Sequence, residues 1–266
     1  MRHLLTPGSS LSFAFSLAAL LGCAGEPTPA PVAPCPAPPP PVAPAVAPVA
    51  VAPAPAAVPV PEGPVLKACA NGMQPGPEGL FDDLEDNNNQ VAVVDGRSGY
   101  WWEAHAPHAS FSAPGPEFRV SDGGPTGSKK TAHVAGKTDV ADVWGASLGA
   151  NFLGGGFYDV SKYAGISFKI KGTAKGFVRF KIHDVSTHPD GGVCKECWNA
   201  FGKTIELTGD WQTLELPFAE LTQQMGWGSP HPPQLNTTKV KHLEWAVDQG
   251  IDFDFSVDDI KLLVCK

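Results

Sequence analysis

The stretch Ile251-Asp-Phe253-Asp-Phe255-Ser-Val257 alternates apolar and polar side chains without a break. Successive side chains of a β-strand point to opposite faces, so this alternation predicts a strand with one face in a core and the other in water. Clusters of Gly, Pro and Asp separate it from other runs of the same period. Many short strands joined by such turns predict an all-β domain, a two-sheet sandwich or jelly roll. The other alternating runs cover residues 166–171, 177–183, 211–216 and 242–247.

Proline divides the chain into two parts. Sixteen of the 28 prolines lie between residues 26 and 64, in a segment with almost no charge and no aromatic residue. Recurrent proline prevents helix formation and favours polyproline II, which rises about 3.1 Å per residue. We therefore expect residues 23–64 to be a disordered tether that reaches on the order of 100 Å, with a proline-rich docking segment as the alternative. The folded domain is expected over residues 65–266.

The N-terminus has the pattern of an export signal. The apolar run Leu11-Ser-Phe-Ala-Phe-Ser-Leu-Ala-Ala-Leu-Leu21 is shorter than the roughly 20 residues that a membrane span needs. It ends in Ala19-Leu-Leu-Gly-Cys23, which resembles the lipobox of bacterial lipoproteins. This resemblance implies a signal peptide over residues 1–22 and a lipid on Cys23, with an ordinary secretory signal as the alternative. We expect an exported protein that the lipid anchors to the outer membrane or the cell surface, or to the periplasmic face.

The net charge of −8 argues against nucleic acid as a partner, because that partner requires a basic surface. We expect a monomer. The chain has neither a nucleotide-binding loop nor a G-x-S-x-G nucleophile motif.

Six motifs in order resemble a galactose-binding-like jelly roll close to the family 11 carbohydrate-binding modules. The resemblance runs from about Gly79 to Leu263 and implies a two-sheet sandwich, a structural calcium ion and a bound polysaccharide or oligosaccharide. The motifs are Leu80-Phe-Asp-Asp-Leu-Glu85-Asp, Gly99-Tyr-Trp-Trp102, Trp144-Gly-Ala-Ser, Tyr158-Asp-Val-Ser-Lys-Tyr163-Ala-Gly-Ile-Ser-Phe-Lys-Ile-Lys-Gly172, Asp210-Trp-Gln-Thr-Leu-Glu-Leu-Pro-Phe218 and Phe253-Asp-Phe-Ser-Val-Asp-Asp-Ile260.

The same resemblance places an acid near the first strand beside an acid near the last. Here those residues are Glu85 and Asp259, and Ca²⁺ prefers such oxygen ligands. Asp259 has the parity of Val257, so it should point inward unless a bulge intervenes. Solvated loop carboxylates are the alternative to a calcium site.

Four cysteines belong to the expected domain. Chain ends lie close together in this fold, so Cys69 and Cys265 are expected to form a disulfide, which would stabilise by roughly 4–5 kcal/mol. Cys194 and Cys197 are expected to form a local disulfide that stiffens a loop. A redox pair, or half of a zinc site with the nearby His183 and His188, are the alternatives. Cys35 lies in the tether.

Sugars bind flat aromatic faces and polar side chains. Trp227 lies in a Gly/Pro loop, Trp198 follows the cysteine pair, and at least one member of the Tyr100-Trp-Trp102 run should face outward. We expect Trp227, Trp198 and Trp102 to contact a glycan. The polar face of the run at residues 177–183 adds Arg179, Lys181 and His183, with Asp184 beyond, and the run at residues 242–247 adds His242 and Glu244. Trp144, Trp211 and Trp245 are expected in the core.

The function expected from these observations is non-catalytic carbohydrate binding by a surface-anchored lipoprotein. Two other classes remain open. One is a structural or adhesion lipoprotein that binds protein partners, and the other is a glycan-active enzyme.

Overall fold

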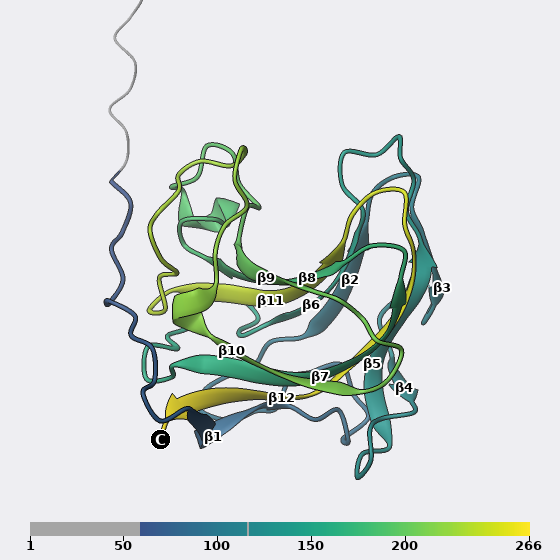
Figure 1. The fold of residues 1–266 in the computed structure, drawn as a ribbon, viewed down its shortest axis with the longest axis horizontal. Helices are drawn as coiled ribbons and strands as arrows, with labels where there is room; N and C mark the ends of the chain where they lie inside the picture. The colour runs from purple at the N-terminus through teal and green to yellow at the C-terminus, as the bar shows by residue number, and fades with distance from the viewer. Residues whose placement is uncertain (1–58, 116) are drawn as a thin grey trace, which may run out of the picture. The chain divides into compact units, whose positions relative to one another are not determined.

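The computed structural model describes residues 59–115 and 117–266, and these form an all-β sandwich of two antiparallel sheets (Figure 1). The predicted signal peptide, Cys23 and Cys35 lie outside the described residues. The strands are β1 (Met73–Asp82), β2 (Trp101–His105), β3 (Ser110–Ala113), β4 (Val120–Asp122), β5 (Lys130–Lys137), β6 (Ala146–Asn151), β7 (Gly165–Ala174), β8 (Val178–Asp184), β9 (Phe201–Ile205), β10 (Gln212–Pro217), β11 (Val240–Val247) and β12 (Asp252–Cys265). The 3-10 turns are η1 (Pro189–Gly191) and η2 (Phe218–Glu220).

The seven-stranded sheet is built around β12. Its order is β10-β7-β12-β5-β3, with β1 paired to β12 and β4 paired to β5. The alternation that predicted β12 holds, because Phe253, Phe255 and Val257 are all buried. The second sheet has the order β2-β6-β11-β8-β9. Antiparallel pairing with one face buried confirms the sandwich expected from the sequence.

Aromatic rings fill the space between the sheets. The Trp245 ring lies 5.3 Å from the Phe168 ring and 5.9 Å from the Trp101 ring, measured between centroids. Trp245 is fully buried, as the sequence predicted. On β8 and β11 the other parity, which includes Lys181 and Glu244, points away from this core. The core therefore fixes which side chains of the five-stranded sheet face outward.

A bulge interrupts β12 at Asp258 and Asp259. The pairing register with β7 shifts between Asp258 and Lys261, and Asp259 has a positive φ of 54°. The bulge moves the chain by one position, so Asp258 is fully buried while Asp259 reaches Lys169 and Lys261 at 3.1 and 2.6 Å. The bulge is the exception that the parity argument allowed for, and it places Asp258, not Asp259, in the interior.

The two ends of the domain are joined. A disulfide links Cys69 to Cys265, as predicted, and β1 pairs with β12 beside it. The sandwich also contacts residues that precede Val65, where the domain was expected to begin. The carbonyls of Pro61 and Pro64 accept hydrogen bonds from the Asn236 and Gln234 side chains, so the end of the expected tether packs on the sandwich. Among the described residues, no helix is long and apolar enough to span a membrane.

Candidate functional site

A groove of about 1100 Å³ lies on the outer face of the five-stranded sheet. Loops rise from this sheet on both sides, away from the seven-stranded sheet (Figure 1). Apart from Val247 at the end of β11, the strand residues that line the groove have the outward parity, as on β8, where Arg179 and Lys181 face it while the intervening Phe180 is buried. Parity along each strand thus separates groove residues from core residues.

Two loops form one wall of the groove and present Trp198 and Trp227. The loop after β8 carries a disulfide between Cys194 and Cys197, which confirms the local disulfide and leaves neither sulfur as a zinc ligand. Backbone hydrogen bonds join this loop to the next one: Lys195 N donates to Ser229 O at 2.8 Å, and Ser229 N donates to Glu196 O at 3.0 Å. The two tryptophan-bearing loops therefore brace one another.

Both of these tryptophans keep a large part of their surface exposed. Trp198 is 51% exposed and Trp227 is 44% exposed, and both line the groove. The Asn199 amide donates hydrogen bonds to the carbonyls of Trp227 and Gln224 at 2.5 and 2.8 Å, which holds the Trp227 loop beside Trp198. Exposed aromatic faces on a braced loop can stack on a ligand with little loss of conformational entropy.

Trp102 lies across the floor of the groove. It belongs to β2 and pairs with Gly149 of β6, and a Cβ atom at Gly149 would be 2.1 Å from the Trp102 ring. Glycine at this position therefore lets the indole lie flat on the sheet. The indole Nε1 donates to Asn151 Oδ1 at 3.1 Å, which fixes its orientation. This outcome confirms that one ring of the Tyr100-Trp-Trp102 run faces outward, while Trp101 enters the core.

Trp144 was expected in the core, and the structure contradicts this. It lies in the loop between β5 and β6, is 42% exposed and lines the groove together with Trp198. The expectation failed because Trp144 is outside a strand, where parity carries no information. Trp211 was also expected in the core, but it is only partly buried, and the Lys171 ammonium lies 5.1 Å from its ring.

The centre of the floor is polar. Glu244 of β11 lies opposite Lys181 of β8, and the Lys181 Nζ atom lies 3.0 Å from Glu244 Oε1. Ser147 of β6 donates a short hydrogen bond to the same oxygen. Burial raises the pKa of Glu244, but Lys181 and the hydrogen bond from His183 outweigh it and hold that pKa well below its ordinary value. Glu244 is therefore an ionised, fully engaged carboxylate.

Three histidines lie beside Glu244. His183 is fully buried, and its Nε2 lies 2.6 Å from Glu244 Oε2. The His242 ring centroid lies 4.3 Å from that of His183, and the Trp198 ring lies 5.1 Å from that of His188. Burial lowers the pKa of all three histidines, to about 4 for His188 and well below the ordinary value for His242. All three imidazoles are therefore neutral at physiological pH.

Arg179 and Asp184 were both predicted to contact a glycan, but only Arg179 faces the groove. Arg179 lines the groove as expected, and its Nη2 donates to Thr222 O at 2.6 Å. Asp184 does not line it. Asp184 is fully buried, and its carboxylate accepts hydrogen bonds from Ser186 N at 2.9 Å and Asn236 N at 2.8 Å. Asp184 therefore holds a turn together and is not available to a ligand, which contradicts the role expected for it.

The sequence missed several polar residues of the groove. Asn151, Gln224, Lys241 and Asp248 all line it. Asn151 ends β6 with the same outward parity as Ser147, so a strand assignment for residues 146–151 could have found it. Gln224 and Asp248 lie in loops, where no periodic signal exists.

The acids expected to bind calcium lie at the β1–β12 end. Glu85 Oε1 accepts hydrogen bonds from Lys129 N at 2.7 Å and Lys130 N at 2.8 Å. Desolvation raises the pKa of the buried Asp258 to about 6, and the negative charge of Glu85 contributes to this rise. Asp258 Oδ2 has no hydrogen-bond partner among residues 59–115 and 117–266. A buried, unpartnered carboxylate oxygen near a second acid suits a hard cation, so Asp258 fits the expected calcium better than Asp259 does.

Several solved structures to which the chain is similar are carbohydrate-binding modules. One is the family 11 module of the cellulosomal cellulase Lic26A-Cel5E of Clostridium thermocellum, with 19% identity and a TM-score of 0.49 over 74% of this chain and 96% of that one. Another is the family 11 module from Clostridium thermocellum in complex with a β-1,3-1,4-mixed-linked tetrasaccharide, with 20% identity and a TM-score of 0.45 over 62% and 89%. A third is the family 30 module of the cellulase Cel9D-Cel44B of Clostridium thermocellum, with 16% identity and a TM-score of 0.47 over 71% and 97%.

No curated protein sequence matches the chain. A family model does: the model described as Carbohydrate binding domain 30 matches residues 97–263. That stretch begins at the buried Arg97 and includes β2 to β11 and most of β12, and so every strand that lines the groove. Because the match covers more than half of the 266 residues, the chain belongs to the carbohydrate binding domain 30 family.

Proposed function

We propose that the groove on the five-stranded sheet binds a polysaccharide or oligosaccharide, and that the protein is a non-catalytic, lipid-anchored glycan-binding protein. One observation carries the proposal: four tryptophans line a groove whose floor is polar, in a chain of a carbohydrate-binding family. Sugar rings present apolar faces edged by hydroxyl groups, so they suit rings at the wall and hydrogen-bonding groups at the floor. The tryptophans are Trp102, Trp144, Trp198 and Trp227.

The state of the groove carboxylate supports binding without catalysis. A glycosidase needs one carboxyl group with a raised pKa, which protonates the leaving oxygen. Glu244 has the opposite property, because Lys181 and His183 hold its pKa well below its ordinary value. Its oxygens accept hydrogen bonds from Ser147 and contact Lys181 and His183, so it acts best as an acceptor that orders its neighbours.

Presentation at a membrane surface is part of the proposal and rests on the sequence. The Ala19-Leu-Leu-Gly-Cys23 motif would supply the lipid, and the tether would hold the domain away from the membrane. A monomer suits this arrangement, since one groove on one anchored chain is sufficient to retain a polymer.

Binding of the full chain to an oligosaccharide array and to insoluble polysaccharides, with Ca²⁺ present, tests the proposal. Trp227→Ala and Trp198→Ala are each expected to weaken binding at least about tenfold, which corresponds to about 1.4 kcal/mol. Trp211→Ala is the matched control, because Trp211 directly precedes β10, an edge strand of the other sheet, and does not line the groove. Equal binding by all three variants, or no glycan bound by a folded chain, would refute the proposal and favour a protein-binding lipoprotein.

A further inference from the structure

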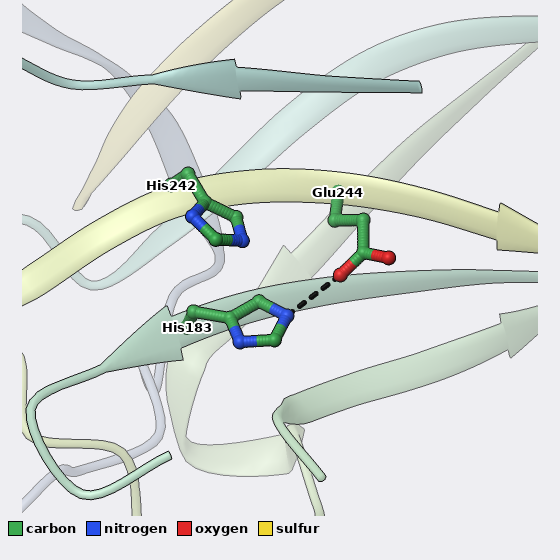
Figure 2. Close-up of side chains that lie close together, drawn as sticks. All are labelled: His183, His242 and Glu244. Atoms are coloured by element: carbon green, nitrogen blue, oxygen red, sulfur yellow. Dashed lines mark hydrogen bonds and ion pairs between the residues drawn. The ribbon is translucent and has the colours of Figure 1, made fainter. Parts of the chain in front are cut away.

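Three donor side chains converge at the floor of the groove, where His242 and Glu244 line it and His183 is fully buried beside them. His183 of β8 and His242 of β11 face each other directly across the strand pair, and Glu244 follows two residues later on the same face. Figure 2 shows the two rings and the carboxylate directed toward a common point. One ligand atom from each of the three residues lies within 4.8 Å of the other two. This separation is small enough for a single ion to contact all three after modest side-chain movement.

The donors are enclosed but not satisfied by their neighbours. His242 Nε2 is buried and has no hydrogen-bond partner in the described part of the chain. A buried polar atom without a partner loses its hydrogen bonds to water and gains none in return, so such atoms are rare in native proteins. Burial also lowers the pKa of both histidines, which leaves each imidazole neutral with a free lone pair. A neutral imidazole is the form that binds a metal.

We propose that His183, His242 and Glu244 form a binding site for a divalent transition metal ion of the zinc class. Two imidazole nitrogens and one carboxylate oxygen suit Zn²⁺, whereas Ca²⁺ and Mg²⁺ prefer an all-oxygen set. Three protein ligands leave a fourth tetrahedral position. His242 and Glu244 line the groove, so that position faces the groove, where water or a hydroxyl of a bound molecule completes the coordination.

Some neighbours of Glu244 favour binding of the metal ion, and one disfavours it. Ser147 and Lys181 contact Oε1, which fixes the carboxylate and leaves Oε2 toward His183. The Lys181 ammonium, 3.0 Å from Oε1, repels a second cation. The 2.6 Å contact between His183 Nε2 and Glu244 Oε2 is a hydrogen bond without metal. When the ion binds, the single proton of the neutral ring moves from Nε2 to Nδ1, so Nε2 offers its lone pair to the metal and no net proton is released. At low pH, protonation of the imidazoles competes with the ion, so affinity falls.

Titration of Zn²⁺ into the full chain, expressed without a histidine tag, tests the site. Excess Ca²⁺ is kept present so that an oxygen-only site is already occupied. The expected result is one bound Zn²⁺ per chain, and Co²⁺ in its place should give the visible absorption of tetrahedral coordination. His242→Ala and Glu244→Gln should each weaken Zn²⁺ binding at least about tenfold, which is what the loss of even an indirect ligand contact causes.

His133→Ala is the matched control. His133 Nε2 contacts Asp254 at 2.9 Å in an exposed histidine–carboxylate pair on the other sheet, so its loss should leave Zn²⁺ affinity unchanged. Lys181→Met should strengthen Zn²⁺ binding, since it removes the opposing charge. Thermal melting without metal shows whether each variant is folded. If the wild type binds no Zn²⁺, or if His242→Ala and Glu244→Gln are folded and bind it as tightly as the wild type does, the proposal is wrong. Glycan binding is measured separately with Ca²⁺ present and no Zn²⁺ added, so the two proposals can fail independently.

Discussion

The burial of Asp258 predicts how the free energy of unfolding changes with pH. Desolvation raises the pKa of this carboxyl group from 3.8 to about 6, and Asp258 Oδ2 has no partner among the described residues. The shift is roughly two pKa units, which at 1.36 kcal/mol per unit makes the ionised group unfavourable by about 3 kcal/mol at neutral pH. The folded pKa lies above the unfolded pKa, so the folded state holds the proton more tightly. The contribution of Asp258 to stability is therefore fully present below about pH 4 and is lost as the pH rises through about 6.

Asp258→Asn removes this pH dependence because the amide does not ionise. Between pH 4 and pH 7.5, with a chelator present, the wild type should lose about 2–3 kcal/mol more unfolding free energy than the variant does. A buried amide also needs partners, at about 1–2 kcal/mol, so the net gain of the variant at pH 7.5 is about 1–2 kcal/mol. Added Ca²⁺ should stabilise the wild type by about 2.7 kcal/mol at a hundredfold excess over its Kd, and leave the variant unchanged.

Urea unfolding followed by tryptophan fluorescence at several pH values measures these differences. Asp259→Asn is the matched control on the neighbouring residue. Burial opposes ionisation of Asp259 as well, but Lys261 and Lys169 outweigh it and lower the pKa of Asp259, so its ionised form stabilises the fold. Asp259→Asn should therefore reduce stability at pH 7.5 and matter less at pH 3. Parallel pH profiles for the wild type and Asp258→Asn would refute the reasoning.

Three further predictions concern other parts of the chain. Gly149→Ala should weaken glycan binding at least about tenfold (about 1.4 kcal/mol), because the new Cβ displaces the Trp102 ring. The variant should still unfold cooperatively, and unchanged affinity on the glycan array would contradict the prediction. Arg97→Met should lower the unfolding free energy by about 3–5 kcal/mol, since the buried guanidinium donates to the carbonyls of Glu78 and Leu80 at 2.6 and 2.7 Å. A decrease of less than about 1 kcal/mol in the unfolding free energy measured in urea would argue against this role. Cys23→Ser should move the protein from the membrane fraction to the soluble fraction on cell fractionation, and retention in the membrane would exclude lipid anchoring through Cys23.

The strands and their outward faces could be predicted because parity is a local property. Phe180 separates Arg179 from Lys181, and this alone places both charged residues on one face, whichever strand lies beside them. The two disulfides followed from the positions of the cysteines relative to the expected fold. The parity of a strand depends only on a short stretch of chain, so the sequence of that stretch is enough to predict it.

The remaining features depend on events that a local pattern does not contain. A single bulge exchanges the positions of Asp258 and Asp259 and so reverses the parity argument at the β12 acids. Trp144 and Gln224 lie in loops, whose shape is set by the contacts around them. The meeting of His183 with His242 requires the register between β8 and β11, which sequence spacing alone does not set.

The Cys69–Cys265 disulfide has a mechanical consequence if the groove holds a polymer while the N-terminus is anchored. Tension between the two would then pass through the domain and leave it at Cys69. Because the disulfide joins the start of β1 to the end of β12, that load enters both strands at once. β1 therefore cannot be peeled away alone, since a covalent bond prevents extension of the 196-residue interval between the two cysteines. Pulling would straighten only the chain ahead of Cys69, and the groove would keep its shape under load.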